Sequence, residues 1–410
     1  MEGRLHASMA KRIGIKERIP RNQPLRSMDT HPGVRSRKRV LARAIYRHGP
    51  AKSAPTGTLV KLVGAIRLFL ALAVAYDHLS QQNIMGLEAI PRTWLFGMNG
   101  PFSVLFFYII SGFLISFAIS NKYGTTRSGI IRFFDSRFIR IFSLYWPLLI
   151  LSVLEPPSRH WLSSAPVIDK VTSVTLLGMD WASSFDTYPN PKIVTVPILG
   201  QAWTLGAELT FYLMAPFLFR SWKAAAVALI GSAVIRAILV GNLGLHPVWS
   251  FTFFPSTLVF FMLGFFARAA SERLRVLGNP FAGVTLVAAS FLIMALPDTN
   301  WDTGGFWVAI LCFSMGLPGV FACTKNLGFL NALGNLSYPL YLTHEFVLVH
   351  WHGMMQHLTD QWGSVVCYLF AVVMCLAIAS ASHALLEQPV AKLMRLGVAK
   401  YRAEPAVNSG

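Results

Sequence analysis

Charged residues are scarce in this 410-residue chain: Asp, Glu, Lys and Arg together make up 13% of it. Soluble globular proteins carry about 25%, so the composition excludes a soluble enzyme. Cysteine is also rare, and the four cysteines lie in apolar runs without a disulfide or zinc spacing, which excludes a disulfide-stapled secreted chain. Hydrophobic residues make up 54% of the chain. These values indicate a polytopic membrane protein.

Acidic residues are few as well: 18 Asp and Glu stand against 36 Lys and Arg, which gives a net charge of +18. Residues 1–58 hold 14 of the basic residues and three of the acids. We expect this region to be a disordered cytoplasmic tail that orients the protein and contacts anionic lipid. No nucleic-acid-binding module follows it, so nucleic acid is not an expected partner. We expect no cleaved signal peptide, because the basic region is too long and Arg67 and Asp77-His78 interrupt the apolar segment that follows.

Long apolar runs make up most of the remaining chain. A transmembrane helix needs roughly 20 apolar residues, and continuous runs favour helices over the alternating strands of a barrel. Ten segments qualify: 59–79, 99–120, 138–155, 197–219, 222–240, 247–267, 280–297, 304–323, 334–355 and 363–386. With a cytoplasmic amino terminus, the cytoplasmic loops and carboxyl tail hold 15 Lys and Arg, and the opposite loops hold four. This asymmetry supports an even number of spans.

The sequence therefore predicts an all-α, polytopic fold of about ten transmembrane helices, with both termini cytoplasmic. The membrane domain covers residues 59–392, and a short cytoplasmic tail covers 393–410. Residues 156–196 form the long loop on the opposite side. Trp161 and Trp181 in this loop suit either a sugar-binding surface or a structural lid.

Ionisable side chains inside the hydrocarbon layer are costly, so each is a candidate functional residue. Arg67 and His78 lie on the first predicted helix, 11 residues apart. This spacing is about three turns, or about 16 Å, so both project from nearly the same face. Asp77 points about 100° away from His78 and is a poor partner for it. A lone helix histidine is more often structural, and the arginine on the same face strengthens the catalytic alternative.

Polar residues also lie inside other predicted helices. Glu208 follows Trp203 in the fourth helix, and a carboxylate at that depth needs a partner such as Arg67 or a histidine. The remaining candidates are Ser111 and Gly112 in the second helix, Tyr341, His344 and Glu345 in the ninth, and His383 and Glu387 in the tenth. For the serine–glycine pair we favour close packing by small residues. The last two, one turn apart, can simply pair with each other.

Arg137 and Arg140 precede or enter the third predicted helix on its cytoplasmic side. Membrane anchoring explains such clusters in most proteins, but guanidinium groups also bind phosphate in a bidentate fashion. His350, His352 and His357 lie at the end of a span without matching acids. We therefore expect no metal ion.

The order of these motifs resembles the acyltransferase-3 family of integral membrane proteins, which move acyl groups onto extracytoplasmic sugars, lipopolysaccharides, exopolysaccharides and related acceptors. The resemblance covers most of residues 59–392. The matching pieces, in order, are Arg67 and His78; Phe106-Phe107 and Ser111 to Ile115; Arg137 to Arg140 and Tyr145-Trp146-Pro147; Trp203 to Glu208, Phe211-Tyr212 and Pro216; Ser337-Tyr338, Tyr341-Leu342 and His344; and Glu387-Gln388-Pro389. Two positions depart from the family pattern: Thr204 replaces the usual serine, and Leu105 stands where an acid is often found.

The resemblance implies an enzyme that transfers an acyl group from cytoplasmic acyl-CoA, in the simplest case acetyl-CoA, to a hydroxyl of an extracytoplasmic sugar, polysaccharide or glycolipid. Arg137 and Arg140 match the family's arginine pair and would contact the donor's phosphates. His78 matches the histidine thought to catalyse transfer, and Arg67 its companion. Glu208 would orient His78, compensate its charge or position the acceptor. The matched Ser111, Trp203, Tyr341, His344 and Glu387 are substrate-binding or structural candidates.

Two other functions stay open. A secondary transporter or flippase would use the buried Arg, Glu and His as a proton or substrate path, and it is expected to show an inverted repeat that we do not find. A non-catalytic membrane sensor would leave the ordered motifs unexplained. Within the enzyme interpretation, direct transfer and a transient acyl-histidine both stay open, and the sequence defines neither the acceptor nor the oligomeric state.

Overall fold

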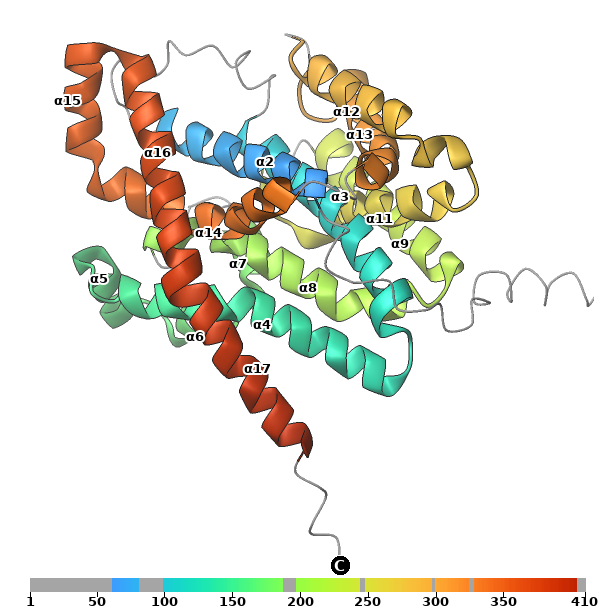
Figure 1. Cartoon of the computed structure of the whole chain (residues 1–410), viewed down its shortest axis with the longest axis horizontal. Coiled ribbons are helices and arrows are strands. Elements are labelled where there is room, and N and C mark those ends of the chain that lie inside the picture. Colours follow the sequence, from blue (N-terminus) through green and yellow to red (C-terminus); the bar gives the residue numbers. More distant parts are fainter. Residues whose placement is uncertain are drawn as a thin grey trace, which may run out of the picture. The chain divides into compact units, whose positions relative to one another are not determined.

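The computed structural model describes six stretches of the chain (Figure 1). They are residues 61–80, 99–186, 197–243, 248–296, 299–323 and 328–403. Every regular element in these ranges is a helix, and the ranges contain no strand. The all-α prediction is therefore confirmed for this part of the chain. The predicted basic tail and the end of the carboxyl tail lie outside the described residues.

The helices differ widely in length. In chain order they are α2 (Lys61–Ser80), α3 (Gly100–Ala118), α4 (Arg127–Ser152), α5 (Pro156–Ser164), α6 (Val167–Thr175), α7 (Met179–Asp186), α8 (Trp203–Leu218), α9 (Trp222–Arg236), α10 (Val248–Phe251), α11 (Phe254–Ser271), α12 (Pro280–Met294), α13 (Gly304–Cys323), α14 (Gly328–His350), α15 (His352–Trp362), α16 (Ser364–Ser382) and α17 (Gln388–Ala403). Short π- or 3₁₀-helical turns extend or precede several of them.

Within the described ranges, six helical stretches are long and apolar enough to cross a membrane. They are Val63–Ser80, Gly100–Tyr123, Trp222–Asn242, Trp249–Ser271, Gly304–Ala322 and Ser364–Arg402. The 15-residue helix α12 is apolar but shorter. These lengths support a multi-pass integral membrane protein. The count of ten spans and the cytoplasmic position of both termini stay predictions.

Two regions are more helical than predicted. α4 begins at Arg127, well before the predicted start, because Thr126 caps it. The Thr126 hydroxyl accepts a hydrogen bond from the backbone N–H of Gly129 at 3.2 Å. The arginines of the third predicted helix therefore lie well inside a helix. In the predicted long loop, residues 156–186 form the short helices α5, α6 and α7.

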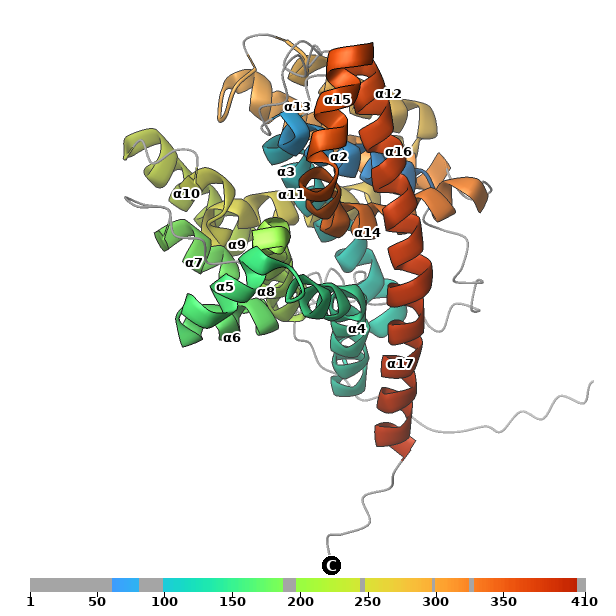
Figure 2. The same ribbon diagram turned by 90° about the vertical axis from the view of Figure 1, so that its left-hand side faces the viewer.

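The last helical stretch continues through Pro389, past the predicted end of the tenth helix at residue 386. α16 passes through the π-helical turn η7 (His383–Glu387) into α17, and Figure 2 shows the two helices along one line. A proline inside a helix lacks one N–H donor and crowds the carbonyl group four residues earlier. The wider π-helical turn directly before Pro389 leaves space for that carbonyl. The helix consequently extends to Ala403, across the predicted domain boundary at residue 392.

Glycines let the helices that position the site pack closely. α2 lies against α14, where a Cβ atom on Gly334 would be 2.5 Å from the Cα of Gly64. α3 lies against α11, where a Cβ atom on Gly112 would be 1.8 Å from the backbone oxygen of Phe261. Small residues at such crossings let membrane helices approach closely. The packing interpretation is confirmed for Gly112.

We expect Gly112→Ala to destabilise the protein, because the added methyl group does not fit unless α3 or α11 moves. Overpacking of this kind costs about 1–3 kcal/mol. The thermal unfolding midpoint in detergent should therefore fall. Gly231→Ala on α9 is the matched control, since nothing lies within 4 Å of a Cβ atom there. Equal midpoints for the two variants would contradict the close crossing.

A buried arginine links α9 to the segment before α13. Arg236 is 2% exposed and donates two hydrogen bonds to Asp302, at 2.7 and 2.9 Å, and one to the backbone oxygen of Ser250 at 2.5 Å. Its guanidinium carbon lies 5.0 Å from the ring centre of Phe260 and 5.7 Å from that of Trp307. Arg236 lies inside the fifth predicted helix, residues 222–240, where a charged side chain is unusual. The ion pair with Asp302 and the faces of the aromatic rings compensate this charge.

Candidate active site

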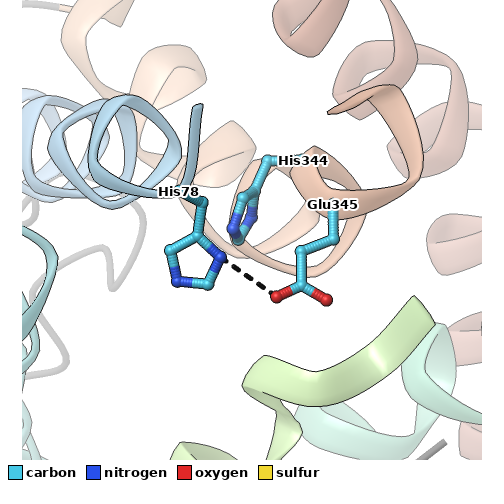
Figure 3. Close-up of side chains that lie close together, drawn as sticks. All are labelled: His78, His344 and Glu345. Carbon is cyan, nitrogen blue, oxygen red and sulfur yellow. Dashed lines mark ion pairs between the residues drawn. The ribbon is translucent and has the colours of Figure 1, made fainter. Parts of the chain in front are cut away.

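Arg67 and His78 both lie on α2, and α14 supplies a partner for His78. His78 Nδ1 lies 3.0 Å from Glu345 Oε1 (Figure 3). The two side chains are 31% and 18% exposed, so the pair is mostly enclosed but reachable. A carboxylate in this position accepts the Nδ1–H of a neutral imidazole and leaves Nε2 able to take a proton. The pair therefore has the geometry of a general base with an orienting acid.

His344 lies beside this pair on α14. Its ring centre is 5.0 Å from that of His78, and the two rings meet edge to face (Figure 3). The side chain is fully buried, and Nδ1 lies 2.8 Å from the backbone carbonyl oxygen of Tyr341. Because a carbonyl oxygen only accepts, Nδ1 holds the proton and Nε2 presents a lone pair. This Nε2 has no hydrogen-bond partner within the described part of the chain.

A cavity of about 120 Å³ collects most of the other residues selected from the sequence. Its polar lining includes Arg67, Ser111, Arg137, Arg140, Glu208 and Tyr341. The Ser111 hydroxyl donates to Glu208 Oε1 at 2.6 Å, and the Tyr212 hydroxyl donates to the same oxygen. The cavity thus combines a carboxylate held by two hydroxyls with three guanidinium groups.

The carboxylate next to His78 is Glu345, whereas Glu208 is held by Ser111 and Tyr212. Glu345 lies in the ninth predicted helix, but the motif match ends one position earlier, at His344, so no role for Glu345 was predicted. The contact follows from the packing of α2 on α14, which no single sequence reveals. The orienting role of Glu208 stays a prediction.

Arg140, which lines the cavity, forms an ion pair with Glu387. Arg140 Nη1 lies 2.6 Å from Glu387 Oε1, and His383 Nδ1 lies 2.7 Å from Glu387 Oε2. The guanidinium carbon of Arg140 is also 4.9 Å from the ring centre of Tyr338. The expected contact between His383 and Glu387 is therefore present, and it extends to Arg140 and fixes the direction of that side chain.

Arg137 and Arg140 also line a second cavity, of about 410 Å³. Basic side chains dominate its lining. They are Lys122, Arg132, Arg137, Arg140, Arg395 and Arg402, and the acids are Asp135 and Glu387. A cavity of mainly one charge sign concentrates ligands of the opposite sign, so this cavity favours an anionic ligand.

Tyr341 lines the first cavity and also contacts His344, which lies beside the His78–Glu345 pair. It lies one helical turn before Glu345 on α14. Its hydroxyl is 2.8 Å from Thr204 Oγ1, and its ring centre is 5.9 Å from that of His344. The threonine that departs from the family pattern thus still presents a hydroxyl to Tyr341. Trp203 instead packs edge-on against a phenylalanine of α10, with 4.7 Å between ring centres.

Asp180 on α7 is a buried carboxylate that the sequence analysis missed, because it lies in the predicted loop. The residue is 0% exposed and packs against α8, where a Cβ atom on Gly206 would be 3.2 Å from the Asp180 nitrogen. Burial raises the pKa of Asp180 to about 6.

We expect Asp180→Asn to stabilise the protein at pH 8 and to have little effect at pH 4. The folded pKa is raised above the unfolded value of 3.8, so folding favours the protonated form and stability falls as the pH rises from 3.8 to about 6. Above this range the ionised carboxylate costs on the order of 3 kcal/mol, which the amide avoids. Unfolding midpoints in detergent at the two pH values measure the effect. A variant that is less stable at pH 8 would contradict it.

Residues 63–383 match the model of a family described as an acyltransferase domain. Nodulation protein 10 of Rhizobium leguminosarum bv. viciae is 28% identical over 374 residues, which cover 82% of this chain and 94% of that protein. Exopolysaccharide production protein ExoZ of Rhizobium meliloti (strain 1021) is 25% identical over 313 residues, which cover 73% and 92%. No solved structure matches the chain. Because the family match extends over more than half of its length, the chain belongs to the acyltransferase-3 family.

Proposed function

We propose that this protein is a membrane O-acyltransferase that moves an acyl group, in the simplest case acetyl, from acyl-CoA to a sugar hydroxyl of a polysaccharide or glycolipid. The donor enters from the cytoplasm, and the acceptor lies across the bacterial inner membrane. The observation that best supports this is the order of groups in the structure. Tyr341 lines the smaller of the two arginine-lined cavities, and Glu345, the partner of His78, lies one helical turn after Tyr341 on α14.

The arginines suit the phosphates of a CoA ester. Guanidinium groups form bidentate, charge-assisted hydrogen bonds with phosphate oxygens. Arg137 and Arg140 line both cavities, so a donor phosphate in the larger cavity would meet them while the acyl end extends into the smaller one. Basic residues outnumber acidic residues in the lining of the larger cavity, which supports entry of the donor through this cavity.

His78 acts as the general base in this proposal. Glu345 holds Nδ1–H, and Nε2 takes the proton of the acceptor hydroxyl as its oxygen attacks the thioester carbonyl carbon. The carbon–sulfur bond then breaks, and the proton passes from His78 to the thiolate, which leaves as the CoA thiol. Proton transfer by a positioned side chain contributes about 10²–10⁴-fold in rate.

Arg67 and Glu208 have supporting roles in the same cavity. Arg67 lies about three helical turns from His78 along α2, so in this proposal it balances the charge of Glu208 instead of contacting the reacting carbonyl group. Glu208, held by Ser111 and Tyr212, offsets part of the positive charge of the three arginines. In this proposal Glu208 is a positioning residue.

The names of the relatives support a carbohydrate acceptor. One relative is called an exopolysaccharide production protein, and this chain covers 92% of it. The test compares surface glycans of cells with and without the gene by mass spectrometry. We expect a mass difference of one acyl group on a sugar. Identical glycan masses, with the protein present in the membrane, would overturn the proposal.

Arg137→Ala combined with Arg140→Ala is expected to raise the KM for the acyl donor about 10- to 100-fold and to change the acceptor KM little. A hydrogen bond to a charged group contributes about 1.5–3 kcal/mol, and about 1.4 kcal/mol is a factor of ten. Steady-state transfer assays at varied acyl-CoA concentration measure both constants.

Arg140 also pairs with the buried Glu387, so its loss has a structural cost. Arg137→Ala alone leaves that ion pair in place and should still raise the donor KM. Arg220→Ala, between α8 and α9 and outside both cavities, is the control. A donor KM that is unchanged in the single and the double variant would remove the phosphate role.

A further inference from the structure

His78, His344 and Glu345 each offer a metal-ligating atom, and these atoms all lie within 4.8 Å of one another. We propose that the three residues form a binding site for Zn²⁺, and that a bound ion prevents acyl transfer. The binding is independent of the proposed function, whereas the inhibition rests on it. The histidines that the sequence analysis considered for a metal, His350, His352 and His357, are not part of this group.

The spacing of the donor atoms is close to that of a tetrahedral site. Zn²⁺ binds imidazole nitrogen and carboxylate oxygen at about 2.0–2.2 Å, which places neighbouring ligand atoms about 3.3 Å apart. His78 Nδ1 and Glu345 Oε1 are already 3.0 Å apart. The three side chains extend toward one another from α2 and α14 (Figure 3). Small side-chain rotations therefore bring the donor atoms around one ion.

His344 has the hydrogen bonding of a metal ligand. Metal-binding histidines usually donate their second ring N–H to a carbonyl or carboxylate oxygen, which fixes the ring. His344 Nδ1 has such a partner in the Tyr341 carbonyl oxygen, at 2.8 Å. Its Nε2 is buried and lacks a hydrogen-bond partner among the residues that the structure describes. Buried polar atoms are nearly always partnered, and a cation would partner this one.

The ligand chemistry selects the ion. Two imidazoles and one carboxylate suit Zn²⁺, whereas Mg²⁺ and Ca²⁺ prefer oxygen ligands alone. Three protein ligands leave the fourth tetrahedral position to water. His78 and Glu345 are partly exposed, so the protein does not fully enclose the three ligand atoms. A bound ion occupies both members of the proposed base pair, so His78 is then unable to take the proton of an acceptor hydroxyl.

The experiment uses the full-length, tag-free protein in detergent, first stripped with a chelator. Zn²⁺ is titrated by calorimetry, and Co²⁺ is titrated by its visible absorption. We expect one saturable Zn²⁺ per chain and the absorption band of tetrahedral Co²⁺. His344→Gln and Glu345→Gln should each weaken Zn²⁺ binding at least about tenfold, because each removes a ligand.

His350→Gln is the matched control. His350 lies on the same helix and also pairs with a carboxylate, at 2.9 Å from Glu155 Oε1, but lies outside the group. This variant should bind Zn²⁺ as the unmodified protein does. Absence of saturable binding, or equal affinity in the His344→Gln and unmodified proteins, would overturn the site.

The inhibition is measured in the same preparation. Zn²⁺ at its binding stoichiometry should abolish acyl transfer, and a chelator should restore it. Full transfer activity with one Zn²⁺ bound would overturn the inhibitory role. Failure of the metal-free protein to transfer any acyl group would instead refute the proposed function, while the titrations still decide whether the site exists.

Discussion

His78→Ala is expected to lower kcat for acyl transfer about 10²–10⁴-fold, the range that a positioned general base contributes. The side chain is 31% exposed and its only described ion pair is with Glu345, so its removal should leave folding and membrane insertion intact. Transfer of radiolabelled acyl groups in reconstituted vesicles measures the rate, and detergent chromatography checks the fold.

The control for this variant is His350→Ala, which removes a histidine of α14 that is also paired with a glutamate, Glu155. It should retain normal transfer rates. Because His78 and Glu345 act as a unit in the proposed mechanism, the double variant His78→Ala with Glu345→Gln should be hardly slower than His78→Ala alone. Undiminished transfer by His78→Ala would remove this residue from the mechanism.

The second large effect concerns stability and the buried Arg236. Asp302→Asn is expected to lower the free energy of unfolding by about 3–5 kcal/mol, because it leaves the guanidinium buried without its counter-ion. Two hydrogen bonds at 2.7 and 2.9 Å then lose their charged acceptor. Equilibrium unfolding in mixed micelles measures the loss.

Two further variants separate the effect of leaving a buried charge unpaired from the effect of losing an ion pair in general. Glu272→Gln breaks the exposed ion pair between Arg268 and Glu272, in which Glu272 is 60% exposed, and should cost less than about 1 kcal/mol. Arg236→Met combined with Asp302→Leu removes both buried charges and should recover much of the stability that Asp302→Asn loses. Equal losses for Asp302→Asn and Glu272→Gln would contradict the structural role of the buried pair.

Much of the helical framework could be predicted because membrane helices follow from local composition. The predicted segments that begin at residues 222, 280 and 304 start where α9, α12 and α13 start. The misjudged boundaries depend on single local contacts. The cap at Thr126 extends α4 toward its amino end, and the π-helical turn before Pro389 lets the last helix continue.

The candidate site could be predicted only in part. Arg67 and His78 were selected from their depth and helical spacing, which are properties of one helix. The contact between His78 and Glu345 depends on the register of α2 against α14, which the close approach of Gly64 and Gly334 sets in three dimensions. Sequence alone therefore had no means of choosing between Glu208 and Glu345 as the partner of the histidine.

The most direct test of the account is the kcat of Glu345→Gln, measured at saturating acyl donor beside Glu208→Gln. If Glu345 orients His78, Glu345→Gln should lower kcat at least about tenfold and leave the donor KM nearly unchanged. Glu208→Gln, which alters the cavity, should act mainly on the donor KM. A normal kcat for Glu345→Gln together with a large fall in kcat for Glu208→Gln would contradict the assignment of His78 and Glu345 as the catalytic pair.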